Sequence, residues 1–160
     1  MKTTISKTLA LSALPWFATA AASWLALAHA EARTPKPKVL LIDDEGAMLE
    51  LVSLYLDGQG LEVASVRSTD GARVLVERGQ FDLVILDWAL AGAEGAELLR
   101  LSKAQHPDIP VIIFSRGDLD QVGIAGEADA VVRKGSPLEA LSVAIVRNLA
   151  RRDVRARNAA

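Results

Sequence analysis

Short apolar runs alternate with segments of helical periodicity over most of the chain after residue 38. The runs are mostly continuous rather than alternating, which is typical of strands whose two faces are both buried in a parallel sheet. The predicted strands are Val39–Ile42, the weaker Leu61–Val66, Leu83–Leu86, Val111–Phe114 and Ala130–Val132.

Helical periodicity fills the intervals between these strands and follows the last one. The predicted helices are Ala47–Gln59, Ser68 or Thr69 to Arg78, Gly95–Gln105, a short and poor helix over 118–127, and Pro137–Arg152. Glycine or proline stands at several of the expected helix ends, as at Gly79. Strands alternating with helices in this way predict an α/β fold, a doubly wound parallel sheet with helices on both faces.

A different pattern occupies the N-terminus. Residues 9–30 are rich in alanine and leucine, carry no charge, follow Lys2 and Lys7, and end in Ala28-His29-Ala30. A basic start, an apolar stretch and small residues before a cut predict a signal peptide cleaved after Ala30. An uncleaved membrane anchor and a wrongly assigned start codon remain the alternatives. We therefore expect residues 1–30 to lie outside the domain, 31–37 to form a linker, 38–152 the domain, and 153–160 a short basic tail.

The amino-acid composition limits the kinds of binding and catalytic site that the chain could form. The 160 residues carry 18 basic and 20 acidic side chains, so bulk charge gives no reason to expect nucleic-acid binding. The absence of cysteine excludes disulfides, thiolate metal sites and a cysteine nucleophile. With two histidines, a multi-histidine metal site or a Ser-His-Asp triad is hard to build.

Polar residues that could carry chemistry stand directly after the predicted strands, where ligands bind in such sheets. They are Asp43, Asp44, Asp87, Ser115 and Lys134. Three carboxylates at one sheet edge would repel one another unless a cation lay among them, and an all-oxygen cluster open to solvent suits Mg²⁺. Together with a lysine and a hydroxyl, this set predicts phosphoryl transfer to Asp87 as the nucleophile, with an acyl phosphate as the product.

The sequence resembles the receiver domain of two-component response regulators, a family that includes the chemotaxis-regulator fold. The motifs that carry the resemblance are Val39–Glu45, Phe81–Asp87 with Gly95 eight residues later, Pro110–Ser115, and Val131–Lys134 followed by Pro137 and Leu141. The resemblance covers about residues 38–150 and implies a flavodoxin-like (βα)5 fold with strand order 2-1-3-4-5. It implies Mg²⁺-dependent transfer from a histidine kinase or phosphotransfer protein to Asp87, and a chain that catalyses its own phosphorylation and dephosphorylation.

The resemblance also assigns individual roles. Asp44, Asp87 and the backbone carbonyl of Ala89 would hold Mg²⁺ directly, Asp43 would act largely through water, and Ser115 would shift on phosphorylation. Four positions depart from the family pattern: Ala91, Arg116, Val131 and Gly135. No phosphorylation group is lost, so we expect intact chemistry and an altered readout. Without the usual aromatic at Val131, movement should pass to residues 116–118 and the short helix after them.

Eleven residues follow Leu149, too few for a DNA-binding output domain, so we expect a stand-alone receiver that acts on an unknown protein partner without binding DNA. A phosphorylation-independent interaction module is the alternative. A nucleotide binder or an aspartyl phosphatase is disfavoured, because the Asp43–Gly46 loop is not glycine-rich and Ala89 replaces the acid a phosphatase needs.

The expected receiver function predicts a cytoplasmic location, which conflicts with the signal-like segment. Contact with a membrane is expected only through residues 9–30, if they are uncleaved.

Overall fold

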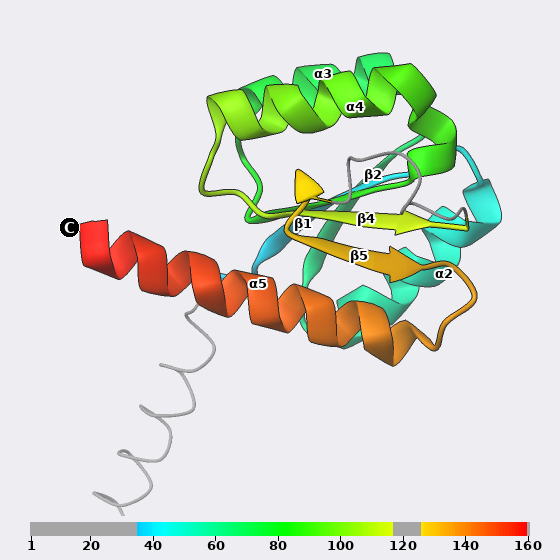
Figure 1. Ribbon diagram of the computed structural model, residues 1–160. Coiled ribbons are helices and arrows are strands. Elements are labelled where there is room, and N and C mark those ends of the chain that lie inside the picture. Colours follow the sequence, from blue (N-terminus) through cyan, green and yellow to red (C-terminus); the bar gives the residue numbers. More distant parts are fainter. Residues whose placement is uncertain (1–34, 117–125, 160) are drawn as a thin grey trace, which may run out of the picture. The chain divides into compact units, whose positions relative to one another are not determined.

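A five-stranded parallel sheet forms the centre of the molecule (Figure 1). The computed structural model describes residues 35–116 and 126–159. The strand order is β2-β1-β3-β4-β5, which confirms the predicted flavodoxin-like arrangement. The strands are β1 (Lys38–Ile42), β2 (Glu62–Val66), β3 (Leu83–Leu86), β4 (Val111–Ser115) and β5 (Ala130–Arg133).

Helices cover both faces of this sheet, α3 and α4 on one face and α2 and α5 on the other (Figure 1). Alternate residues of β1 explain the two layers: Leu40 and Ile42 pack in the core beneath α3 and α4, and Val39 and Leu41 pack beneath α2 and α5. Because both faces are covered, every residue of β3 and β4 is buried, and all of them except Ser115 at the end of β4 are apolar. The helices are α2 (Gly46–Gly58), α3 (Thr69–Arg78), α4 (Trp88–Gln105) and α5 (Leu138–Ala159).

Two helix boundaries differ from the sequence prediction by several residues. Helix α4 begins at Trp88 rather than Gly95, because Asp87 caps it and the alanine-rich stretch that follows contains no proline to stop it. Helix α5 continues past Arg152 to Ala159, because its arginine- and alanine-rich end favours the helix.

Two predicted segments fall outside the described residues: the signal-like stretch over 1–30, and most of the short helix over 118–127. Their assignments remain predictions. Within residues 35–116 and 126–159, no helix has the length and apolar character that a membrane crossing requires.

The ends of α3 follow the predicted signals. Ser68 is the N-cap, and its Oγ accepts a hydrogen bond from the backbone N–H of Gly71 at 3.2 Å. At the other end Gly79 adopts a left-handed conformation with φ of 60°, which glycine reaches without steric cost. A Cβ at this position would lie 2.4 Å from Cε1 of His106, so the imidazole packs directly on the glycine.

A charged contact joins α5 to the edge of the sheet at which the strands begin. Arg152 pairs with the carboxylate of Asp82, which also accepts a 2.7 Å hydrogen bond from the backbone N–H of Lys38. Burial by itself would raise the pKa of Asp82, but the hydrogen bonds from Lys38 and Arg152 outweigh it and hold the pKa below its ordinary value.

Candidate functional site

The backbone ladder of the sheet continues into the candidate residues and thereby aligns them. The N–H of Asp43 donates to the last residue of β2 at 3.1 Å, and the N–H of Asp87 donates to the last residue of β1 at 2.8 Å. The N–H of Lys134 donates to the carbonyl of Ser115, the last residue of β4, at 2.9 Å. These bonds hold the residues after β1, β3 and β5 at one edge of the sheet.

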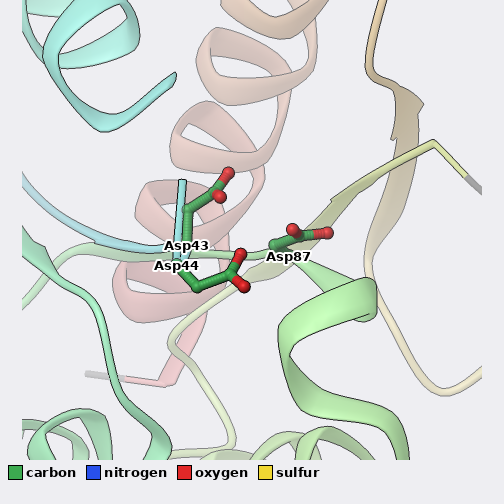
Figure 2. A group of neighbouring side chains, drawn as sticks. All are labelled: Asp43, Asp44 and Asp87. Atoms are coloured by element: carbon green, nitrogen blue, oxygen red, sulfur yellow. The ribbon is translucent and has the colours of Figure 1, made fainter. Parts of the chain in front are cut away.

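Asp43, Asp44 and Asp87 form an acidic cluster at that edge, which Figure 2 shows where β1 and β3 end. One carboxylate oxygen from each residue lies within 4.8 Å of the other two. Asp43 and Asp87 are buried, with 1% and 3% of their surface exposed, whereas Asp44 is exposed. The predicted convergence of the three carboxylates is therefore present, and the cluster is open to solvent on the side of Asp44.

Lys134 supplies positive charge to the buried half of the cluster. Its Nζ lies 2.6 Å from Oδ2 of Asp43 and 2.6 Å from Oδ2 of Asp87, and its side chain is 3% exposed. The ammonium also lies 5.9 Å from the centre of the Phe114 ring, within range of a cation–π contact. Burial alone would lower the pKa of Lys134, but the hydrogen bonds to Asp43 and Asp87 outweigh it and raise the pKa, so the lysine is charged at neutral pH.

The second oxygen of Asp87 is held by the helix that follows it. Oδ1 of Asp87 accepts a 3.0 Å hydrogen bond from the N–H of Ala89, so the carboxylate is the N-cap of α4. The sequence prediction began this helix at Gly95, but Ala89 lies in the first turn of α4. The role of its backbone carbonyl as a metal ligand, which the resemblance implies, stays a prediction.

Of the remaining predicted residues, Ser115 and Arg116 lie at or beside the same edge, and Val131 lies within β5. Ser115 ends β4 and is buried, with 1% of its surface exposed. Val131, at the position where the family has an aromatic, is 42% exposed on β5. Arg116 follows Ser115 and forms an ion pair with Glu45, the residue after the acidic pair.

Arg67 is a contributor to the site that the sequence analysis missed. Its Nε and Nη2 donate to the backbone carbonyl of Asp44 at 3.3 and 3.0 Å, and its guanidinium packs over Gly46. The parallel register that pairs Ile42 with Val66 brings Arg67 beside the acidic loop. No sequence motif marks this residue. Its place beside the site becomes clear only from the pairing of β1 with β2.

The donor set fits Mg²⁺. This ion takes oxygen ligands, prefers few carboxylates, and keeps several waters that an exposed cluster can accommodate. Asp43, Asp44 and Asp87 offer oxygens at one point, and the exposed position of Asp44 leaves one side to solvent. Asp44 and Asp87 are the residues that would hold the ion, with Asp43 beside them, and Lys134 pairs with both buried carboxylates.

Comparison with known proteins agrees with this geometry. The family model described as the response regulator receiver domain matches residues 39–146. The chain belongs to the response regulator receiver domain family. A receiver domain from Clostridium thermocellum has 32% identity and a TM-score of 0.66, covering 74% of this chain and 98% of that one. The receiver TrrA from Thermotoga maritima, solved in complex with Mg²⁺-BeF, shares the fold at a TM-score of 0.65 and 24% identity, covering 70% of this chain and 98% of TrrA.

Curated relatives of this receiver domain are longer proteins. The alginate biosynthesis transcriptional regulatory protein AlgB of Pseudomonas putida is 32% identical over 124 residues, which is 75% of this chain and 28% of AlgB. The phosphate regulon transcriptional regulatory protein PhoB of Rhizobium meliloti is 35% identical over 104 residues, 61% of this chain and 45% of PhoB. The chain thus spans less than half the length of either relative.

Proposed function

We propose that Asp87 accepts a phosphoryl group from a histidine kinase or a histidine phosphotransfer protein, and that the phosphorylated receiver changes its interactions with a partner protein. One observation carries the proposal. The carboxylate of Asp87 lies in an acidic cluster that fits Mg²⁺, with one oxygen 2.6 Å from Lys134 Nζ and the other held by the Ala89 N–H. A carboxylate held in this way has a defined direction of attack.

The reaction balances without further reagents. An oxygen of Asp87 attacks phosphorus and forms a P–O bond, while the P–N bond to the donor histidine breaks. The electron pair of that bond stays on the imidazole nitrogen, which takes up a proton. With acetyl phosphate as donor, the broken bond is P–O and acetate leaves. In both cases the product on Asp87 is an acyl phosphate.

The side chains around Asp87 suit a trigonal, highly charged phosphoryl group. Mg²⁺, when bound by Asp44 and Asp87, would neutralise phosphoryl oxygens as charge builds up on them. Lys134 lies beside the attacking oxygen and can follow the phosphoryl group with a charge-assisted hydrogen bond. Ser115 ends the adjacent strand, and we assign its hydroxyl as a donor to a phosphoryl oxygen.

The proposed partners follow from the family of the domain and from the charge of the chain. Receiver domains take their phosphoryl group from histidine kinases, and TrrA was solved with Mg²⁺-BeF. The near-neutral balance of 18 basic and 20 acidic residues supports a protein partner, not DNA, for the output of this domain. Since a kinase that uses ATP works in the cytoplasm, we place the phosphorylation there. The N-terminal sequence of the chain isolated from cell fractions tests this location, and recovery only from a periplasmic fraction with Glu31 at the terminus would contradict it.

The decisive experiment is labelling of the purified chain with radioactive acetyl phosphate. We expect label with Mg²⁺ present, none after EDTA, and release of the label by hydroxylamine, which cleaves acyl phosphates. Asp87→Asn should abolish labelling, and Ser115→Ala should slow it. Asp108→Asn is the matched control, because Asp108 is an exposed carboxylate outside the cluster.

Two results would overturn the proposal. Labelling of Asp87→Asn equal to that of the wild-type chain would place the phosphoryl group elsewhere. A wild-type chain that takes no label from acetyl phosphate or phosphoramidate would instead favour a phosphorylation-independent interaction module on the receiver fold.

A further inference from the structure

An ion pair joins the two loops on either side of the proposed acceptor. Glu45 stands at the end of the loop after β1, one residue beyond Asp44, and Arg116 comes directly after Ser115 at the end of β4. Nη2 of Arg116 pairs with Oε2 of Glu45, although 71 positions separate the two residues in the sequence.

The strand order shows where this contact runs. In the sheet β3 lies between β1 and β4, and Asp87 is the first residue after β3. A contact from the loop after β1 to the loop after β4 must therefore pass over the end of β3. The Arg116 and Glu45 side chains are 65% and 41% exposed, whereas Asp87 is 3% exposed. The pair thus lies on the solvent side of the proposed acceptor.

We propose that the Arg116–Glu45 pair is a bar across the approach to Asp87, which slows both the arrival of a small phosphoryl donor and the later attack of water. This inference rests on the proposed function. The bar is built from the side chains of Arg116 and Glu45, so it sets the lifetime of the phosphorylated state in this chain. Arg116 is a positioning residue here, because it acts through its contact with Glu45.

The hydrolysis that the bar slows also balances. A water oxygen attacks phosphorus, the P–O bond to Asp87 breaks, and Asp87 leaves as a carboxylate with the electron pair. The water protons go to the departing phosphate and to solvent. Acceptance needs the phosphoryl donor to reach Asp87, and hydrolysis needs water to reach the phosphorus on Asp87. One obstruction of that approach therefore slows both rates.

The pair is suited to slow these steps without blocking them. Ion pairs between exposed side chains are weak and are screened by salt, so the contact opens frequently. We therefore expect several-fold effects on rate, not loss of the reaction.

A double-mutant cycle on the full chain tests the bar. Arg116→Ala, Glu45→Gln and the double variant are compared with the wild type for the rate of labelling by acetyl phosphate and the lifetime of the label. Arg73→Ala and Glu97→Gln are the matched controls, because they break an exposed ion pair between α3 and α4. We expect each site variant to be labelled several-fold faster and to lose its label several-fold faster. The double variant should match the single ones, since either change removes the whole bar.

Opposite effects of the Arg116 and Glu45 variants on the labelling rate would point to a different role for Arg116. If Arg116 acted through its own charge on the phosphoryl group, Arg116→Ala would slow labelling and Glu45→Gln would speed it. That result, purely additive effects, or rates equal to those of the controls would each overturn the bar while leaving Asp87 as the acceptor. A wild-type chain that takes no label from acetyl phosphate or phosphoramidate would overturn the proposed function, and the bar with it.

Discussion

Lys134 and Asp87 lie 2.6 Å apart, Nζ to Oδ2, although they follow strands that do not touch. Lys134 comes after β5 and Asp87 after β3, and β4 lies between these strands. The contact is made across the end of β4 by a side chain that is 3% exposed and that also pairs with Asp43. One lysine therefore pairs with two buried carboxylates, offsets one of their two negative charges, and links three strand ends.

Replacing this lysine should cost more stability than replacing an exposed one. Lys134→Met leaves the carboxylates of Asp43 and Asp87 without their cation, and breaking a buried pair in this way costs about 3 kcal/mol. Urea unfolding in EDTA at neutral pH measures the loss, with Lys38→Met, which breaks an exposed pair with Glu62, as the control. Equal losses in the two variants would contradict the prediction. Mg²⁺ should recover part of the loss in Lys134→Met, because it binds the same carboxylates.

The contribution of Lys134 to folding stability at alkaline pH follows from its raised pKa. A raised pKa in the folded state means that the stabilisation is complete below the ordinary lysine pKa of about 10.4 and is lost as the pH rises through the raised value. The stabilities of the wild type and Lys134→Met should therefore stay apart through neutral pH and converge only in strong alkali. Denaturant titrations over a pH series measure this, and convergence near neutral pH would contradict it.

The contribution of Asp82 to folding stability should depend on pH in the opposite direction, and it should be lost in acid. Its pKa is lowered in the folded state, so its stabilisation is present above the ordinary aspartate pKa of about 3.9 and is lost as the pH falls through the lowered value. We expect Asp82→Asn to lose about 1 kcal/mol at neutral pH, the scale of a partly exposed ion pair, and to approach the wild type in acid. Asp57→Asn is the control, since its pair with Lys36 is exposed. A pH-independent difference between the wild type and Asp82→Asn would exclude this account.

Gly79 and Gly58 should respond differently to alanine. At Gly79 the left-handed φ of 60° and the His106 ring 2.4 Å from a Cβ both oppose a side chain, so Gly79→Ala should lose about 2 kcal/mol. A Cβ on Gly58 meets no atom within 4 Å in the described part of the chain, and alanine favours the helix there. Thermal melts should show a lower midpoint for Gly79→Ala and an unchanged or higher one for Gly58→Ala. Similar midpoints would show that His106 moves aside without cost.

Arg67 should affect Mg²⁺ binding more than folding. Arg67→Ala removes both hydrogen bonds to the carbonyl of Asp44, so the loop that carries a proposed ligand loses its support. Loss of such an outer contact typically weakens metal binding by about tenfold or more. Calorimetric titration with MgCl₂ measures the affinity, urea unfolding measures stability, and Arg73→Ala is the control for loss of an exposed arginine. Arg67→Lys should restore part of the affinity. Unchanged Mg²⁺ affinity in Arg67→Ala would remove this role.

Local sequence was sufficient to predict the central strands and the residues at their ends. Continuous apolar runs such as Leu83–Leu86 have one stable environment, a strand buried on both faces, and parallel strands bring the residues after them to one edge. The convergence of Asp43, Asp44 and Asp87 was predicted on that basis, and the structure places them together. A cap at Ser68 or Thr69 and the stop at Gly79 were also predicted, because capping depends on residues within one turn of the helix end, and the structure has Ser68 as the cap.

Contacts between distant segments were decided by the tertiary structure. The early start of α4 is an exception, because its cap is local: an aspartate directly after a strand is as typical of a loop as of an N-cap. The hold of Arg67 on Asp44 and the pairing of Arg116 with Glu45 arise from strand register and strand order. A charged side chain on the surface has many possible partners in sequence, and only the packing of the sheet brings one of them within reach.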